Sequence, residues 1–213
     1  MEGAVKIEGG FAEVEAGEWL VSHGQPAASL GNFRRLRRKG WFVRDRAALD
    51  LVRTGGRAFF ALAAAPFLTH IPCAAPVFAV SCKVLVAPEA ARVGAQSLKV
   101  IPMSMKSSFC VTEFGGGEWV VMATASRTAR IPVGDGETLS ARPEAVVAWT
   151  GRLPTGFCPR LGLLDILLPR APRDLLLTFY GPGVVWVEGA CAGNQTIKQS
   201  NNQAIFSRRT HGL

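Results

Sequence analysis

The sequence has few of the features that mark a disulfide-stabilised, metal-binding or helical protein. Its cysteines are odd in number and form no CxxC pair, and the chain is too long to need disulfide bonds for stability. We therefore expect reduced thiols at Cys73, Cys82, Cys110, Cys158 and Cys191. The three histidines lie far apart and outside any HExxH motif, so no metal site is predicted. His70, in an apolar stretch, is expected to be a hydrogen-bonded core residue.

Catalytic patterns are equally scarce. The carboxylates Asp135, Glu137, Asp165 and Asp174 suit turns or the surface, because none forms a recognisable acid-base pair. The glycine-rich GGGEW segment (115–119) precedes VVMAT rather than a helix start with a lysine, which excludes a phosphate loop. The sequence thus predicts no catalytic residue, no cofactor and no enzymatic activity. A small-molecule binding barrel or cupin-like enzyme is disfavoured because its His and carboxylate ligands are missing.

What the sequence does contain is typical of an all-β protein. Of its 213 residues 48% are hydrophobic, and 23 Gly and 13 Pro separate many short apolar runs. The stretch 58–82 has no formal charge, but Pro66, Pro72 and Pro76 would break a membrane-spanning helix. We expect buried strands there, and the part from Phe59 to Val80 is a candidate interface if the chain forms a trimer.

Two internal repeats are visible. SSFCVTEFGGGEWVVMA resembles RDLLLTFYGPGVVWVEG at an offset of 66 residues, and each copy reads as a strand, a glycine turn and a strand. The turn glycines would supply positive φ angles within hairpins. A second, weaker repeat has an offset of 119 residues and aligns Leu20 with Leu139. The predicted fold is a β-sandwich or barrel of duplicated hairpin modules over 1–190, followed by a polar tail at 191–213. The predicted structural turn residues are Gly115, Gly117, Gly181, Pro182 and Gly183.

Positive charge is concentrated in one segment. The formal net charge of the chain is +8, and all but +2 of it comes from the run RRLRRKGWFVRDR (34–46). Clustered cations beside aromatics suit phosphates and unpaired bases, but they equally suit an acidic protein or lipid surface, or a solvated face. The candidate residues for RNA or another anionic partner are Arg34, Arg35, Arg37, Arg38, Lys39, Trp41, Arg44 and Arg46.

Three segments together resemble a known family. LLLTFYGPGVVWVEG (175–189), GDGETLSARPEAVVAWTGRLP (134–154) and FGGGEWVVMA (114–123) are similar to the closing strands of the family of altered inheritance of mitochondria protein twenty-four. GEWLVSHGQPAASLG is a weaker match to an earlier module of that family. The resemblance covers about 107–190, whereas RRLRRK and IPCAAPVFAV depart from it.

The resemblance implies a fold similar to that of the tryptophan RNA-binding attenuation protein, often assembled as a homotrimer, with no established enzymatic activity. It implies mitochondrial biogenesis and a location in the matrix or at the inner-membrane surface, with the bacterial cytoplasm as the alternative. The acidic N-terminus lacks a transit-peptide pattern, so any organellar precursor would have been trimmed. We expect a non-enzymatic mitochondrial scaffold or assembly factor whose basic segment contacts an anionic partner. The alternative is an RNA-binding protein, free or bound in a mitochondrial ribosome or other ribonucleoprotein.

Overall fold

The structure is a computed structural model that describes residues 5–21, 26–36, 49–99, 108–115, 117–157 and 176–189. Within these ranges the chain forms β-strands joined by turns and short 3-10 helices, with no α-helix. The all-β class expected from the sequence is therefore confirmed. Residues 190–213, including the predicted polar tail, lie outside the described part.

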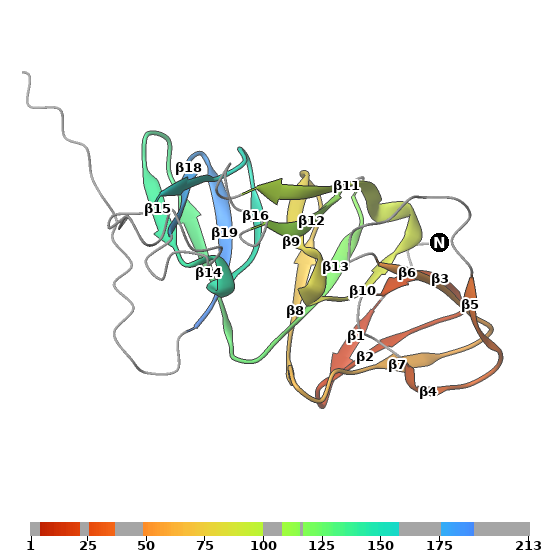
Figure 1. The fold of residues 1–213 in the computed structure, drawn as a ribbon. Coiled ribbons are helices and arrows are strands. Elements are labelled where there is room, and N and C mark those ends of the chain that lie inside the picture. Colours follow the sequence, from red (N-terminus) through yellow and green to blue (C-terminus); the bar gives the residue numbers. More distant parts are fainter. Residues whose placement is uncertain are drawn as a thin grey trace, which may run out of the picture.

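Strand pairing divides the described chain into three successive units that occupy neighbouring positions along the molecule (Figure 1). Unit 1 holds β1 (Lys6–Glu8), β2 (Phe11–Val14), β3 (Gly17–Val21), β4 (Pro26–Ser29), β5 (Phe33–Leu36), β6 (Asp50–Thr54) and β7 (Ala58–Phe60). Unit 2 holds β8 (Phe67–Pro72), β9 (Val77–Val80), β10 (Val84–Pro88), β11 (Arg92–Lys99), β12 (Ser108–Phe114) and β13 (Trp119–Thr124). Unit 3 holds β14 (Thr128–Val133), β15 (Thr138–Ala141), β16 (Val146–Thr150), β17 (Thr155–Phe157), β18 (Leu176–Tyr180) and β19 (Gly183–Glu188).

The units share their sheets. The first sheet has the order β1-β2-β7-β4, the second β5-β6-β3-β10-β13-β8, the third β11-β12-β9-β16-β19-β14 and the fourth β15-β18-β17. Each six-stranded sheet takes three strands from one unit and three from the next, joined by the antiparallel pairs β3·β10 and β9·β16. The pairing thus continues from unit to unit through the middle of the molecule.

Three hydrophobic cores lie between the four sheets in turn. The first core joins the first and second sheets around Phe60 and Trp19, and the second joins the second and third sheets around Met122 and Phe114. The third core joins the third and fourth sheets around Trp149. The central strands of each six-stranded sheet are therefore buried on both faces, which explains why apolar residues run consecutively in strands such as β10 and β13.

The same irregularity recurs in all three units and fixes their alignment. One strand of each unit is bulged where it pairs with the last strand of its unit. The bulge lies between Pro26 and Ala28 in β4, between Val84 and Val86 in β10, and between Val146 and Ala148 in β16.

This alignment confirms both repeats but changes the offset of each by one residue. Met122 and Val187 occupy equivalent positions beside the bulge, an offset of 65 rather than 66. Ala28 and Ala148 are likewise equivalent, an offset of 120 rather than 119. The shift restores the pattern of burial, because Phe114 then matches buried Phe179 instead of exposed Tyr180.

The predicted hairpin modules are wrong in one respect. β12 pairs with β9 and β11, whereas β13 pairs with β8 and β10, so the turn at Gly115 and Gly117 carries the chain from the third sheet to the second. In the same way Gly181 and Pro182 carry it from the fourth sheet to the third, and Gly183 is the first residue of β19. Each repeated segment is a corner between two packed sheets, not a hairpin.

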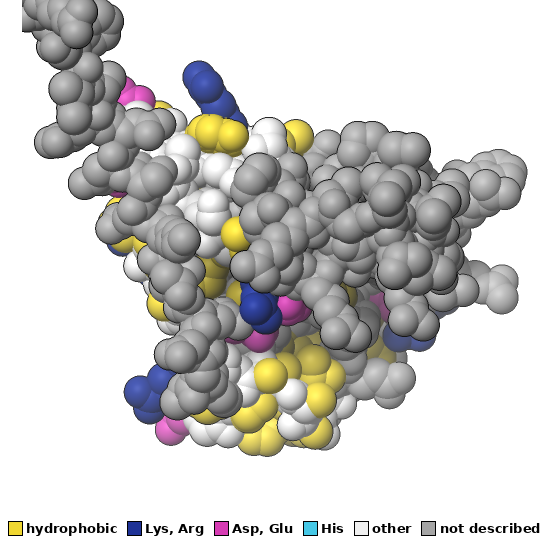
Figure 2. Space-filling model, turned by 60° about the vertical axis from the view of Figure 1, so that its left-hand side comes forward, with side chains coloured by type: hydrophobic (Ala, Val, Ile, Leu, Met, Phe, Trp, Pro, Cys, Tyr) yellow, Lys and Arg dark blue, Asp and Glu magenta, His cyan; other side chains and the backbone are white. Residues whose placement is uncertain are grey.

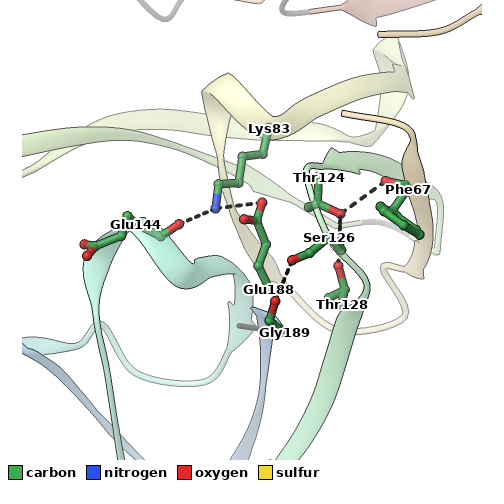
Figure 3. A network of polar contacts seen from close by, with 8 residues as sticks. All are labelled: Phe67, Lys83, Thr124, Ser126, Thr128, Glu144, Glu188 and Gly189. Atoms are coloured by element: carbon green, nitrogen blue, oxygen red, sulfur yellow. Dashed lines mark hydrogen bonds and ion pairs between the residues drawn. The ribbon is translucent and has the colours of Figure 1, made fainter. Parts of the chain in front are cut away.

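Polar contacts reinforce the junction between units 2 and 3 (Figure 3). Lys83, in the 3-10 helix Ser81–Lys83, lies 3.2 Å from the Glu188 carboxylate and donates to the Glu144 carbonyl at 2.6 Å. The Ser126 hydroxyl donates to the carbonyl of Gly189 at 2.6 Å. The ion pair is largely shielded, with Lys83 and Glu188 side chains 17% and 20% exposed. These contacts hold the last strand of unit 3 against unit 2.

The uncharged stretch 58–82 forms the strands β7, β8 and β9. β7 and β9 are largely buried, as expected, whereas Ile71 is the one buried residue of β8. Several residues of the candidate trimer interface, among them Phe67 and Pro72, are exposed, and that interface stays a prediction. Across the described residues, no helix has the length and apolar character needed to span a membrane.

Glycine is needed for different reasons at two of these corners: for its backbone conformation at Gly117 and for the space it leaves at Gly181. Gly117 has a φ of 83° with open space around it, whereas a Cβ on Gly181 would lie 1.8 Å from the Gly134 carbonyl oxygen. We expect Gly117→Ala to lower the free energy of unfolding by about 1 kcal/mol through backbone strain alone. Gly181→Ala should lower it by about 3 kcal/mol or more, because two backbone segments must separate. Urea unfolding of both variants measures the difference, and equal losses would contradict the close approach.

Candidate anion-binding edge

The described part of the basic segment begins on an edge strand. β5 forms the outer edge of the second sheet and pairs only with β6 among the described strands. Arg34 lies opposite Arg53 in this pairing, and Arg53 lies opposite Glu18 of β3. Arg34 and Arg35 are both exposed, so the first two cations of the segment face solvent at the rim of unit 1.

Acidic neighbours neutralise most of the described arginines here. The Arg35 guanidinium lies 2.9 Å from the Asp50 carboxylate on β6. Arg53 pairs with Glu18 through two guanidinium nitrogens, and Arg57 lies 3.3 Å from the Glu13 carboxylate. These exposed pairs contribute little to stability, on the order of 0–1 kcal/mol each.

Arg34 differs from its neighbours. Its side chain makes no ion pair or hydrogen bond with the described residues, and the nearest charge across the strand pair is Arg53, of like sign. A cation placed opposite another cation is unfavourable unless an anion joins them. The edge of β5 therefore carries one uncompensated positive charge in the described part of the chain.

The remaining predicted residues of the basic segment, Arg37, Arg38, Lys39, Trp41, Arg44 and Arg46, lie outside the described residues. The two ends of this connection are fixed, however, because Leu36 pairs with Leu51 across β5 and β6. The segment thus leaves and rejoins the molecule at one end of this strand pair, beside Arg34.

Elsewhere the visible charges are dispersed. Figure 2 turns the unit 3 end of the molecule forward, and the Lys and Arg side chains seen there lie singly, several beside acidic ones. This distribution contrasts with the run of cations that starts at Arg34. Sequence reasoning found the cationic run but missed Asp50 and Glu18, which neutralise its neighbours. No local pattern could have revealed those partners, because Glu18 is 35 residues from Arg53.

An exposed aromatic also lies at this edge and was not predicted. Phe33, the first residue of β5, is 39% exposed and directly precedes Arg34. An exposed aromatic ring beside cations is the combination that stacks on unpaired bases in single-strand binding proteins.

Histidine and cysteine take positions that the sequence only partly predicted. His70 is exposed on β8 with its ring centroid 5.9 Å from that of Trp119, so the expected core position is wrong. Partial desolvation lowers the pKa of His70. Cys73 is buried and Cys82 exposed, and desolvation raises the pKa of both thiols, that of Cys73 to about 11. No group of three or more potential metal ligands occurs within the described ranges.

Comparison with known proteins adds the fold alone. No family model and no curated protein matches the chain. A Streptococcus pyogenes protein whose X-ray crystal structure came from a structural genomics consortium superposes with a TM-score of 0.63 at 13% sequence identity. The match covers 88% of this chain and 92% of that protein, so the two share an all-β fold over most of their length.

Burial of Cys73 leads to a prediction about its reactivity. Because only the thiolate reacts, a pKa of about 11 instead of 9.0 should slow alkylation at pH 8 roughly one hundredfold. Iodoacetamide labelling of the native protein and of the urea-unfolded chain, read by mass spectrometry of the Cys73 peptide, measures this. Equal rates in the two states would contradict it.

The raised pKa of Cys73 also affects the pH dependence of folding. Burial of the neutral thiol favours the folded state below pH 9.0, and this contribution to the free energy of unfolding is lost as the pH rises from 9.0 to about 11.

Proposed function

We propose that this protein is a non-enzymatic scaffold or assembly factor that contacts an anionic partner through the edge of β5. The observation that carries the proposal is Arg34, an exposed arginine opposite Arg53 whose side chain has no acidic partner among the described residues. An incoming carboxylate or phosphate would pair with the Arg34 guanidinium as Glu18 pairs with that of Arg53.

The architecture supports a scaffolding role. Three units joined by continuous sheets form a long, internally fastened body, with ion pairs such as Lys83–Glu188 at the junction. Such a body holds Arg34 and Arg35 on a paired edge strand, since β5 pairs with β6. The family resemblance described above adds the expectation of a mitochondrial location and of a protein complex as the partner.

RNA binding is the second candidate, favoured by one specific observation. Phe33 exposes a ring on the same edge strand as Arg34 and on the same face as Arg35, because side chains alternate along a strand, and this ring is available to stack on a base. Such a contact would make the protein an RNA-binding component of a ribosome or another ribonucleoprotein.

The test removes Arg34 and three cations of the basic run that lie outside the described residues, and it leaves Arg35 in place. Arg34, Arg37, Arg38 and Lys39 are changed to Gln, while Arg35 is kept because it pairs with Asp50. A control variant loses the same charge from exposed arginines of unit 3, at Arg127, Arg130, Arg142 and Arg152. We expect native affinity capture to lose its partners with the first variant and to keep them with the control.

Ribonuclease treatment and salt separate the two candidates. Partners of a scaffold persist through ribonuclease, whereas RNA-held partners disappear. Direct RNA binding would also weaken steeply with salt, by a slope of about 0.7 per single-strand phosphate in log affinity against log salt. Capture that is unchanged by the four substitutions would contradict both candidates.

A further inference from the structure

Among the described strands, the one at each end of the molecule has no counterpart of the partner that joins the units in the middle. β3 pairs with β10 of the next unit, and β9 pairs with β16 of the next unit. The counterpart of β3 and β9 in unit 3 is β15, and the counterpart of β10 and β16 in unit 1 is β4. β15 and β4 are end strands of the fourth and first sheets, and they lie at opposite ends of the molecule (Figure 1).

The end sheets are two halves of the repeated sheet. Each six-stranded sheet consists of two halves of three strands. The first kind of half is β5-β6-β3 or β11-β12-β9, and the second kind is β10-β13-β8 or β16-β19-β14. The fourth sheet, β15-β18-β17, corresponds to the first kind, and the β4-β7-β2 part of the first sheet corresponds to the second kind. Joined through β15 and β4, they would give the strand order of the interior sheets.

Side chains of β4 are also more exposed than the equivalent side chains in the other units. Ala28 is exposed, whereas its equivalents Val86 and Ala148 are fully buried. Leu30, at the end of β4, is 55% exposed, the highest value among the exposed large hydrophobic side chains of the described chain. Apolar surface that neighbouring units cover in the middle of the molecule is thus uncovered at its end.

The two strands also carry no charged residue. Charges are one of the devices that keep exposed sheet edges from pairing with another chain. They occur in the edge strands β1, β5, β11 and β14, at Lys6, Arg34, Arg92 and Arg130. The sequences of β4, PAAS, and β15, TLSA, contain none, and the same holds for the edge strands β8 and β17.

We propose that β15 of one copy of this chain pairs antiparallel with β4 of a second copy, so that copies associate head to tail. The register follows from Ala79↔Ala148 and Leu20↔Ala87 at the internal junctions. Transferred through the repeat, it places Leu139 opposite Leu30, Ser140 opposite Ser29 and Ala141 opposite Ala28. Because two different surfaces meet, the association is heterologous and either closes into a ring or extends.

The test uses one substitution at each end. Ala28→Lys and Ser140→Lys each place a charge where the junction would bury it, while Ala28 is exposed and Ser140 half-buried in the single chain. Ala129→Lys, at an exposed position on the edge strand β14, is the matched control. Multi-angle light scattering should give assemblies of two or more copies for the wild-type chain and the control, and monomers for each test variant.

Mixing the two test variants identifies the pairing itself. The Ala28→Lys chain keeps an intact β15 and the Ser140→Lys chain keeps an intact β4, so the mixture should form a dimer that grows no further. A mixture that stays monomeric, a monomeric wild-type chain at every concentration, or test variants that assemble normally would overturn the proposal. Thermal unfolding of each variant confirms that the chain is folded, and Ala27→Lys, at a second exposed position of β4, replaces Ala28→Lys if that chain unfolds. None of these outcomes depends on the anionic partner.

Discussion

Main-chain pairing between successive units is the constraint on which the rest of the structure depends. The pairs β3·β10 and β9·β16 join strands of successive units into two continuous six-stranded sheets, whose central strands are buried on both faces. A sheet covered on both sides needs apolar residues in succession, which accounts for runs such as VLVAP in β10 and VVAWT in β16. The bulge in the same position of each unit adjusts the twist where these strands meet their neighbours.

Burial on both faces also determines where charge is placed. The described ion pairs lie at exposed rims and at the junction of units, as with Arg35–Asp50 on the β5 edge and Lys83–Glu188 between units 2 and 3. Arg34 is likewise exposed on the edge strand β5. The proposed contact with an anionic partner uses this edge, which the pairing with β6 holds in place.

The all-β class and the internal repeat were predictable from the sequence, because glycine turns and β-branched runs recur in order. The exact offset was not, because aligning the glycine turns at Gly115 and Gly181 gives 66, whereas the strand register gives 65, and Phe114 was matched with Tyr180 instead of Phe179. The hairpin interpretation was wrong because a Gly-x-Gly turn looks the same whether the next strand returns to its own sheet or crosses to another. His70 was misplaced because apolar neighbours in sequence do not reveal an edge strand.

Of the candidate site, the cationic run was visible in the sequence, but its partners were not. Asp50 and Glu18 come from other strands, and only the strand register brings them beside Arg35 and Arg53. That register also distinguishes Arg34 from its neighbours, a distinction that charge counting cannot make.

Native-state hydrogen exchange at increasing urea tests most directly whether the shared sheets make the three units one cooperative structure. The account predicts that amides of β3, β10, β9 and β16 lose protection together, at the free energy of global unfolding. Protection lost separately in unit 1 or unit 3, at clearly lower free energy than in unit 2, would contradict it.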